Sequence, residues 1–411
     1  MRSDCVSIVT IGDELLLGQI TDTNSSWLGL SLASLGWNVV SKYTIGDRVD
    51  DITLTLNRAS KDAAIVLVSG GLGPTSDDMT LLSIAKFFNC DLVVHEHTRK
   101  RIKSYFENKN RTMSAQHARQ YTLPEIAEVL DNNVGTAPGL RIHQKGILFY
   151  FFPGVPTEMK FLFNTYVLPS LKSLNQERVT LFTAGIGETD VVDTILDIIK
   201  EFPRNISIAY LPYHGGVRLR LTEVKEKGSG HSKINYFKEK IITRLQDFYI
   251  AENHNEWATI MGELLKERGL MMATGESCTG GYIAHKITSV PGASEYFLGS
   301  VISYANEIKE NLLNVSSHVL DTYGAVSEEC AREMLAGLCN ATNCDIGIVT
   351  TGIAGPGGGT KDKPVGTVFV AVGNKERILV QKFSFRSSRA GIIEHTFNRG
   401  MHMIYKFLSK G

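Results

Sequence analysis

The sequence predicts an α/β protein in which two parallel-type, three-layer α/β domains are joined by a small α+β domain. The first observation is the length of 411 residues, which is too great for one ordinary hydrophobic core. The second is that β-branched runs alternate with amphipathic helical stretches in both terminal parts of the chain, as in parallel sheets covered by helices. The third is a middle stretch in which a predicted hairpin lies between two helices.

Composition limits the classes of protein that fit. Hydrophobic residues make up 43% and charged residues 21% of the chain, as in soluble globular proteins. Lys plus Arg and Asp plus Glu both number 43, so net charge gives no argument for a nucleic-acid partner. No apolar run reaches the roughly 18–20 residues that cross a membrane, and the first apolar run resembles a strand rather than a leader. Six scattered cysteines without a C-x-x-C pair indicate neither zinc nor disulfides. We expect a reduced, cytoplasmic protein.

Residues 1–168 form the first predicted domain. Its strand-like runs include VSIVTI, WNVVSKYTIG and AAIVLVSGG, and they are separated by the helical stretches TNSSWLGLSLASLG and DDITLTLNRASKD. Open α/β sheets bind ligands at the carboxyl ends of their strands. The loops that follow these runs are therefore the expected ligand site.

Residues 169–252 and 253–411 form the other two predicted domains. The middle one contains two helical stretches around the hairpin ISIAYLPYHGGVRLRLTEV, a solvated α+β pattern with charges of both signs. The last one begins with the helical stretch NEWATIMGELLKERGL and then repeats the strand–loop–helix pattern. We expect a second helix-covered sheet there.

A glycine-rich loop, GGLGPTSDD at residues 70–78, follows a predicted strand of the first domain. Gly71 and Gly73 let main-chain N–H groups approach an anion, with Thr75 beside them. Asp77 and Asp78 are either helix caps or ligands of a divalent ion that bridges phosphate oxygens. Neither common nucleotide fingerprint fits the loop, so a structural turn and a functional loop both remain open.

Other carboxylates of the first domain follow predicted strands or turns. Asp13 and Glu14 come after the first strand, and Glu158 lies in the Gly/Pro turn PGVPTEM. These three join the metal site if the strand ends meet, and otherwise they are turn or helix-start residues. Asp22 to Asn24 are expected to cap the next helix.

The stretch TGESCTGGYIAHKI, residues 274–287, places Glu276, Ser277, Thr279, Gly280 and Gly281 between a strand and a helix. Ser277 or Thr279 is sufficient as a helix cap, in which case the stretch carries no chemistry. A second glycine loop, TTGIAGPGGG, follows another apolar strand. Two such loops with a hydroxyl are also suited to hold a phosphorylated substrate and an oxyanion.

A serine nucleophile needs a base. No spacing singles out His285, His318, His395 or His402. Tyr304 and Lys309, just past a strand, are the alternative, because a desolvated Lys accepts a hydroxyl proton. Cys278 is a second candidate nucleophile, although small buried cysteines usually only pack.

Eight ordered motifs resemble the CinA family, competence/damage-inducible protein A. They are GDELLLGQITDTNSSWL, GGLGPTSDD, GTAPG, PGVPTEM, GIGE, ESCTGG, TGIAGPGGG and KPVGTVFVA. The resemblance covers essentially the whole chain. It implies a molybdopterin-binding-like domain with metal-dependent ADP-ribose pyrophosphatase activity, a KH-type linking domain, and a C-terminal nicotinamide-nucleotide amidohydrolase domain. It also implies a homodimer and a role in pyridine-nucleotide salvage. The amidohydrolase would need no cofactor, whereas the N-terminal site would use Mg²⁺ or a similar divalent ion.

The resemblance also assigns residues. In the amidase site Ser277 would be the nucleophile, with Tyr304 and Lys309 as its partners. The substrate nicotinamide mononucleotide would be bound by Glu276, Thr279, Gly280, Gly281, Thr351, Gly352, Gly355 and Arg389. In the first domain ADP-ribose would be bound by Gly71, Gly73 and Thr75, and the metal by Asp77, Asp78, Asp13, Glu14 and Glu158. One silent domain, with an N-terminal half that only binds a pterin or nucleotide, remains the alternative.

Overall fold

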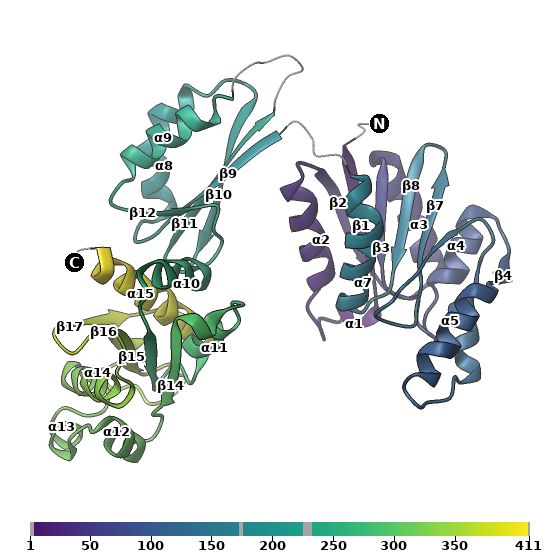
Figure 1. The fold of residues 1–411 in the computed structure, drawn as a ribbon. Coiled ribbons are helices and arrows are strands. Elements are labelled where there is room, and N and C mark those ends of the chain that lie inside the picture. Colours follow the sequence, from purple (N-terminus) through teal and green to yellow (C-terminus); the bar gives the residue numbers. More distant parts are fainter. Residues whose placement is uncertain (1–3, 172–175, 225–231, 410–411) are drawn as a thin grey trace. The chain divides into compact units, whose positions relative to one another are not determined.

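A computed structural model describes residues 4–171, 176–224 and 232–409. The chain divides into two compact units, one holding the residues up to Glu177 and the other most of the chain from Arg178 onward. Figure 1 shows the helices and strands of each unit.

The first unit is built on a six-stranded sheet with the order β2-β1-β3-β8-β7-β6. Strands β2, β1, β3 and β8 are parallel, and at one edge β7 pairs antiparallel with both β8 and β6. The strands are β1 (Cys5–Ile11), β2 (Asn38–Ile45), β3 (Ile65–Ser69), β6 (Glu128–Leu130), β7 (Gly139–Gln144) and β8 (Ile147–Phe152), with β4 (Leu92–Val94) and β5 (Thr122–Pro124) paired separately.

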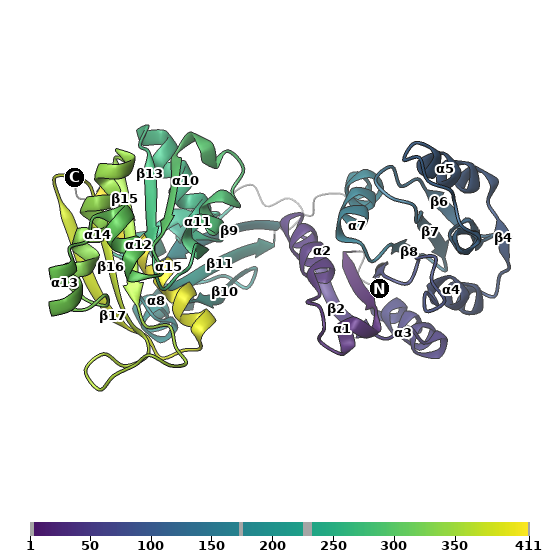
Figure 2. The ribbon, with the colours of Figure 1, turned by 90° about the horizontal axis from the view of Figure 1, so that it is seen from below.

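Helices cover both faces of this sheet, as Figure 2 shows. Apolar residues of α2 and α7 pack on one face, and those of α3 and α4 pack on the other. The strands β1 and β3 are buried along their whole length, which explains their continuous apolar sequence. The helices are α1 (Asp13–Leu16), α2 (Thr23–Ser34), α3 (Val49–Asp62), α4 (Thr80–Phe88), α5 (Glu96–Glu107), η1 (Ala115–His117), α6 (Ala118–Tyr121), α7 (Pro156–Leu162), η2 (Phe163–Val167) and η3 (Leu168–Ser170).

The second unit begins with a four-stranded sheet of order β10-β11-β9-β12. The predicted hairpin is present as β10 and β11, and the apolar faces of α8 and α9 pack with the strands in one core. These elements are β9 (Gln176–Thr183), α8 (Glu188–Lys200), β10 (Ile206–Tyr213), β11 (Gly216–Val224), α9 (Ile234–Arg244) and β12 (Tyr249–Glu252).

A five-stranded sheet of order β14-β13-β15-β16-β17 completes the second unit. Strands β14, β13 and β15 are parallel, and β16 and β17 continue the sheet antiparallel. Helices α10, α11 and α15 pack on one face and α12, α13 and α14 on the other. The elements are α10 (Trp257–Arg268), β13 (Met272–Glu276), α11 (Tyr282–Thr288), η4 (Ala293–Glu295), β14 (Phe297–Ile302), α12 (Asn306–Leu313), α13 (Ser317–Thr322), α14 (Glu328–Thr342), β15 (Ile346–Gly352), β16 (Thr367–Gly373), β17 (Ile378–Ser384) and α15 (Arg389–Ser409).

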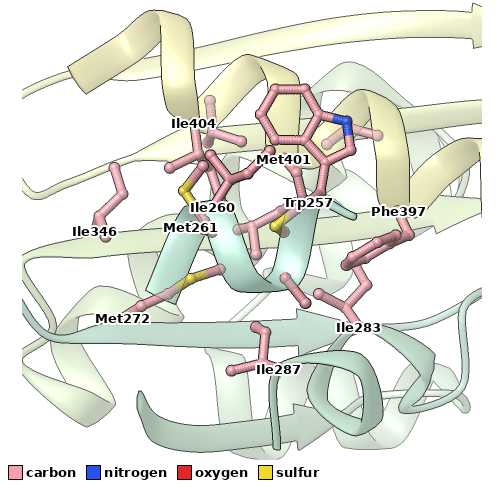
Figure 3. Packing of buried hydrophobic residues seen from close by; sticks show 14 of the residues in the cluster. Trp257, Ile260, Met261, Met272, Ile283, Ile287, Ile346, Phe397, Met401 and Ile404 are labelled. Atoms are coloured by element: carbon pink, nitrogen blue, oxygen red, sulfur yellow. The ribbon is translucent and has the colours of Figure 1, made fainter. Parts of the chain in front are cut away.

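Trp257 of α10 lies in the core that holds the second unit together. Figure 3 shows it beside Met401 of α15. Its ring also meets Phe182 of β9 edge to face, with ring centroids 5.4 Å apart. The four-stranded module thus shares buried residues with the five-stranded domain.

The predicted fold class is confirmed, with one refinement. Each of the two large sheets carries two antiparallel strands at one edge, which the alternation of strands and helices in the sequence did not indicate. All six cysteines are free thiols. None of the helices in the described ranges has the length and apolar character needed to cross a membrane.

Candidate active sites

A cavity of about 230 Å³ lies where β13, β14 and β15 end in the second unit. It brings together residues that are 112 positions apart in the chain, from Ser277 to Arg389. Six predicted site residues line it: Ser277, Tyr304, Lys309, Thr351, Gly352 and Arg389. The other lining residues are Cys278, Asn306, Ala325, Val326 and Ala354.

Ser277 directly follows β13, and its N–H donates to the carbonyl of Thr350 at 3.0 Å. This bond fixes the turn against the end of β15. The side chain is largely buried yet reaches the cavity. Within the described ranges, no residue forms a hydrogen bond with the Ser277 hydroxyl, so this hydroxyl is not used as a helix cap.

Glu276, rather than Ser277 or Thr279, caps helix α11. Its fully buried carboxylate accepts N–H bonds from Gly281 and Ile283, both at 3.0 Å, and from Ala284 at 2.8 Å. Glu276 was predicted to bind substrate. Its carboxylate instead bonds the N–H groups of α11, and Glu276 does not line the cavity.

Thr279, Gly280 and Gly281 shape the turn and do not line the cavity. The Thr279 hydroxyl pairs with that of Thr350 at 2.8 Å. Gly280 and Gly281 have φ values of +59° and +95°, which favour glycine. Their N–H groups are already used, by the Ser277 carbonyl and Glu276 respectively. An oxyanion donor in this turn must therefore be an N–H group other than those of Gly280 and Gly281.

Lys309 is buried on α12, with 1% of its surface exposed. Its Nζ donates to the carbonyls of Ser303 at 2.8 Å and Tyr304 at 3.3 Å. Burial lowers the pKa of the Lys309 ammonium, and nearby thiols and Glu307 only partly oppose this. A buried amine of this kind is suited to exchange protons.

Arg389 connects two sides of the cavity. Its guanidinium donates to the carbonyl of Gly355 at 2.6 Å and to the hydroxyl of Tyr304 at 2.9 Å. Tyr304 is 61% exposed, and its hydroxyl bonds Arg389 rather than Lys309. The loop after β15, the loop after β14 and the start of α15 are thereby held around one opening. Thr351 is fixed as well, because its hydroxyl donates to the carbonyl of Ala325 at 2.6 Å.

Cys278 lies beside Ser277 in the cavity lining. Burial raises the pKa of its thiol to about 12. Because the thiolate is the nucleophilic form of cysteine, this environment disfavours Cys278 as the attacking group and leaves Ser277.

A second cavity, of about 360 Å³, lies at the ends of β1, β3 and β8 in the first unit. The predicted Gly71, Gly73, Glu14, Asp77, Asp78 and Glu158 line it. Gly71 is required by packing, since a Cβ there would lie 2.2 Å from the Thr80 hydroxyl oxygen. Thr75 and Asp13 lie outside the lining.

Asp78 organises the glycine loop from within. Its carboxylate accepts N–H bonds from Gly73 at 2.9 Å and Thr75 at 2.8 Å, and the Thr75 hydroxyl also donates to it. Thr75 is thus a partner of Asp78. Asp13 is tied to Asp47, with each backbone N–H donating to the carboxylate of the other residue.

The carboxylates around this cavity raise the question of a cation. Burial raises the pKa of the Asp47 carboxyl, and the charges of Asp13, Glu14 and Asp78 raise it further. A divalent ion would relieve this repulsion, so the donor set fits one. Within the described part of the chain, however, no three His, Cys, Asp or Glu side chains are arranged to hold a metal by themselves. Phosphate oxygens of a ligand would have to complete the coordination.

Glu158 faces the cavity from the first turn of α7. Burial raises the pKa of its carboxyl, while the bond from the Asn132 amide and the charge of Arg101 lower it. The Arg101 guanidinium also holds the carbonyls of Asn132, Gly135 and Thr136. Glu158 is thus both a helix-start residue and part of the site lining.

Comparison with known proteins matches three family descriptions to successive parts of the chain. They are "Probable molybdopterin binding domain" over residues 7–173, "Damage-inducible protein CinA KH domain" over residues 178–251 and "CinA C-terminal domain" over residues 254–408. A CinA-like protein of Cytophaga hutchinsonii is 38% identical over 95% of this chain and 94% of its own length. The chain belongs to the CinA family.

A further relative agrees with this membership, and the resemblance seen in the motifs is confirmed. A CinA-like protein of Salinibacter ruber is 38% identical over 93% of this chain and 94% of its own. The crystal structure of a CinA protein of unknown function from Thermoplasma acidophilum aligns with 40% of this chain and 96% of its own, at 32% identity and a TM-score of 0.38.

Some polar lining residues of this CinA-family chain were missed from its sequence. Asn306 begins α12 at the C-terminal cavity, and Asp47 and Gln120 line the N-terminal one. Asp47 lies two residues after the end of β2. It could have been predicted in the same way as Asp13, as a carboxylate that follows a strand. Asn306 and Gln120 carry no local signal.

Replacing Glu276 tests its structural role. Glu276→Gln would place an NH₂ group against buried N–H donors and remove a negative charge that they stabilise. We expect a loss of about 2–4 kcal/mol of unfolding free energy, since hydrogen bonds to charged groups contribute about 1.5–3 kcal/mol each. Denaturant unfolding measures it. The control Glu267→Gln, at an exposed position of α10, should be neutral. A neutral Glu276→Gln would contradict the capping role.

Proposed function

We propose that the C-terminal cavity hydrolyses nicotinamide mononucleotide to nicotinate mononucleotide and ammonia. One observation carries the proposal: an uncommitted Ser277 hydroxyl and a buried Lys309 amine with a lowered pKa line the same cavity. An amide is a poor electrophile, so its hydrolysis needs an activated nucleophile. The family membership and the motif ESCTGG, which contains Ser277, also support the proposal.

Lys309 is suited to act as the base. In its neutral form the amine has two hydrogens and one lone pair, and two carbonyl oxygens accept from it. The lone pair therefore remains available for the Ser277 proton. The two side chains are not hydrogen-bonded to each other in this structure, and such contacts often form only once substrate is bound.

The reaction then has two halves. Ser277 Oγ attacks the carboxamide carbon while Lys309 takes its proton, and Lys309 returns that proton to the departing nitrogen as the C–N bond breaks. Ammonia leaves and a serine ester remains. Water attacks the ester carbon, Lys309 accepts a water proton, and that proton passes to Ser277 Oγ as nicotinate mononucleotide is released.

Negative charge on the carbonyl oxygen needs N–H donors. The N–H groups of Cys278 and Thr279 form no backbone hydrogen bond within the described ranges, whereas those of Gly280 and Gly281 are engaged. We therefore assign oxyanion stabilisation to the N–H groups of Cys278 and Thr279. One such donor stabilises the transition state, and so lowers the barrier, by about 3–4 kcal/mol.

Arg389 is the proposed phosphate-binding group. It is a permanent cation at the cavity wall, and its links to Gly355 and Tyr304 orient the guanidinium. Arginine suits phosphate because its planar fork matches phosphate oxygens. Tyr304 then serves mainly to position Arg389.

The test of this proposal is ammonia release from nicotinamide mononucleotide by the full-length protein. We expect turnover that continues in excess chelator, because no step needs a metal. Free nicotinamide, which lacks the phosphate, should be a much poorer substrate. Absence of ammonia from the mononucleotide would reject the proposal.

We further propose that the N-terminal cavity cleaves ADP-ribose to AMP and ribose 5-phosphate with a divalent ion. The carboxylates that face the glycine loop support it. One or two of the carboxylates Asp77, Asp78, Glu14 and Asp47 would hold the ion together with phosphate oxygens, the combination that is characteristic of Mg²⁺. When bound, the ion supplies Lewis acidity toward the pyrophosphate. The glycine loop contributes a close approach of main chain to the phosphates.

Asp77→Asn tests this second proposal. Asp77 lines the cavity, and its side chain contacts the loop through the Thr75 hydroxyl. Its replacement should lower AMP production by at least about 10²-fold while ammonia release is unchanged. Chelator should have the same effect on the wild-type protein. Asp62→Asn, at an exposed helix end, is the control. Full activity in chelator would remove the metal, and binding without turnover would favour a nucleotide-binding module instead.

A further inference from the structure

Gln120 has an unusual position in the first unit. It lies on the short helix α6, only 1% of its surface is exposed, and it lines the cavity of the glycine loop. Its buried Oε1 has no hydrogen-bond partner, and neither end of its carboxamide bonds another residue in the described ranges. Buried polar groups are normally paired.

The backbone around Gln120 is held in place by hydrogen bonds of both neighbouring residues. The neighbouring Arg119 guanidinium donates to the carbonyl of Thr75 at 2.9 Å. The carbonyl of Tyr121 accepts from the N–H of His95 at 2.7 Å. Helix α6 is thereby fixed between the glycine loop and the start of α5, with an amide presented to the cavity in advance of any ligand.

Helix α6 also borders a second, less polar cavity of about 300 Å³. Gly73 and Asp78 line both cavities. Leu81, Leu82 and Leu92 form the apolar part of the second one, with Arg119 at its side. A planar base fits an apolar slot, and phosphates fit the glycine loop. The sugar that connects a base to its phosphates would lie near α6.

Chemistry at the first cavity favours the same placement. Apart from Thr136, its other polar side chains are carboxylates, which accept hydrogen bonds and repel bare phosphate. A carboxamide offers an acceptor at one end and donors at the other. A hydroxyl both donates and accepts, so vicinal hydroxyls pair with either end of Gln120 and with the carboxylates.

We propose that Gln120 is a ligand-binding residue whose carboxamide hydrogen-bonds a ribose hydroxyl of a ribonucleotide bound at the glycine loop. This inference rests on the nucleotide function proposed above for the N-terminal cavity. It makes Gln120 the residue that distinguishes ribonucleotides from their deoxy counterparts.

Calorimetric binding to the full-length protein in Mg²⁺ tests it, with AMP, 2′-deoxy-AMP and 3′-deoxy-AMP as probes. We expect the wild-type protein to bind AMP at least about tenfold more tightly than one deoxy form, since a buried group left unpaired is costly. Gln120→Met should bind AMP about tenfold or more weakly and lose the ribo/deoxy discrimination. Gln120→Asn, which shortens the amide, should do the same. The exposed Gln116→Met is the control and should match wild type.

Thermal unfolding without ligand gives a second readout. Because the amide is unpaired in the structure, Gln120→Met should unfold at the same temperature as wild type or above it. A variant that keeps the discrimination, or a marked fall in unfolding temperature with binding intact, would overturn the inference and make Gln120 structural. If the wild-type protein binds none of the three nucleotides, the proposed N-terminal function fails and the inference fails with it. If instead the protein binds AMP and the Gln120 variants bind it as wild type does, only the inference about Gln120 fails.

Discussion

Ser277→Ala should reduce ammonia release from nicotinamide mononucleotide by about 10⁴-fold or more, on the scale at which loss of a serine nucleophile acts in hydrolases. The reason is that Ser277 places its hydroxyl at the cavity lining, on the turn after β13 and beside the proposed oxyanion donors. Removing one oxygen at a largely buried site should leave the fold intact. A coupled ammonia assay measures the loss.

Two controls separate chemistry from folding in this experiment. Ser289→Ala removes an exposed hydroxyl just after α11 and should keep wild-type turnover. AMP production from ADP-ribose by Ser277→Ala should also be unchanged, since the N-terminal cavity is built from other residues. Wild-type ammonia release by Ser277→Ala would show that another group attacks.

Lys309→Met should lower the same rate by about 10²–10⁴-fold, the usual contribution of a general base. Methionine approximates the length of the lysine stem but cannot accept a proton. The ammonia-release rate of the variant should also depend on pH differently from that of the wild-type protein. The neutral amine is the active form, so the wild-type rate rises with pH through the Lys309 pKa. Burial lowers that pKa, so the rise lies below the ordinary value of about 10.4.

The pH–rate profile of kcat/KM is the measurement that identifies this role. Lys309→Met should lose the rising limb, whereas the exposed Lys382→Met on β17 should retain it. The same group affects stability with a defined sign. Because the folded-state pKa is below the unfolded one, the unfolded chain binds more protons between the two values. Stability should therefore increase with pH across that interval. A variant that retains the limb would exclude Lys309 as the base.

Much of the C-terminal cavity was predictable because strand ends meet at one edge of a sheet. That rule indicated Ser277 after β13 and the glycine loop after β15, and the resemblance added Thr351 and Arg389. The structure places all three at one cavity. Sequence also identified Lys309, although its burial depends on the packing of α12 against α14, which local pattern does not show.

Other features depend on tertiary contacts and were not predictable. Glu276 stands next to Ser277 in sequence, yet the strand alternation turns its carboxylate to the opposite side, toward the amides of α11. Gln120 resembles any polar residue of a short helix until its burial is known. The antiparallel edge strands follow hairpin turns that a pattern of alternating strands and helices does not distinguish from crossovers.

The most direct test of the proposed mechanism is to trap the ester that it places on Ser277. Full-length protein mixed with nicotinamide mononucleotide, quenched in acid within the first turnover and digested, is analysed by mass spectrometry. The proposed mechanism predicts that the peptide containing Ser277 gains the acyl group of nicotinate mononucleotide, and that Ser277→Ala shows no such adduct. Ammonia released in the first turnover with no adduct on Ser277, or with the acyl group on Cys278, would contradict it.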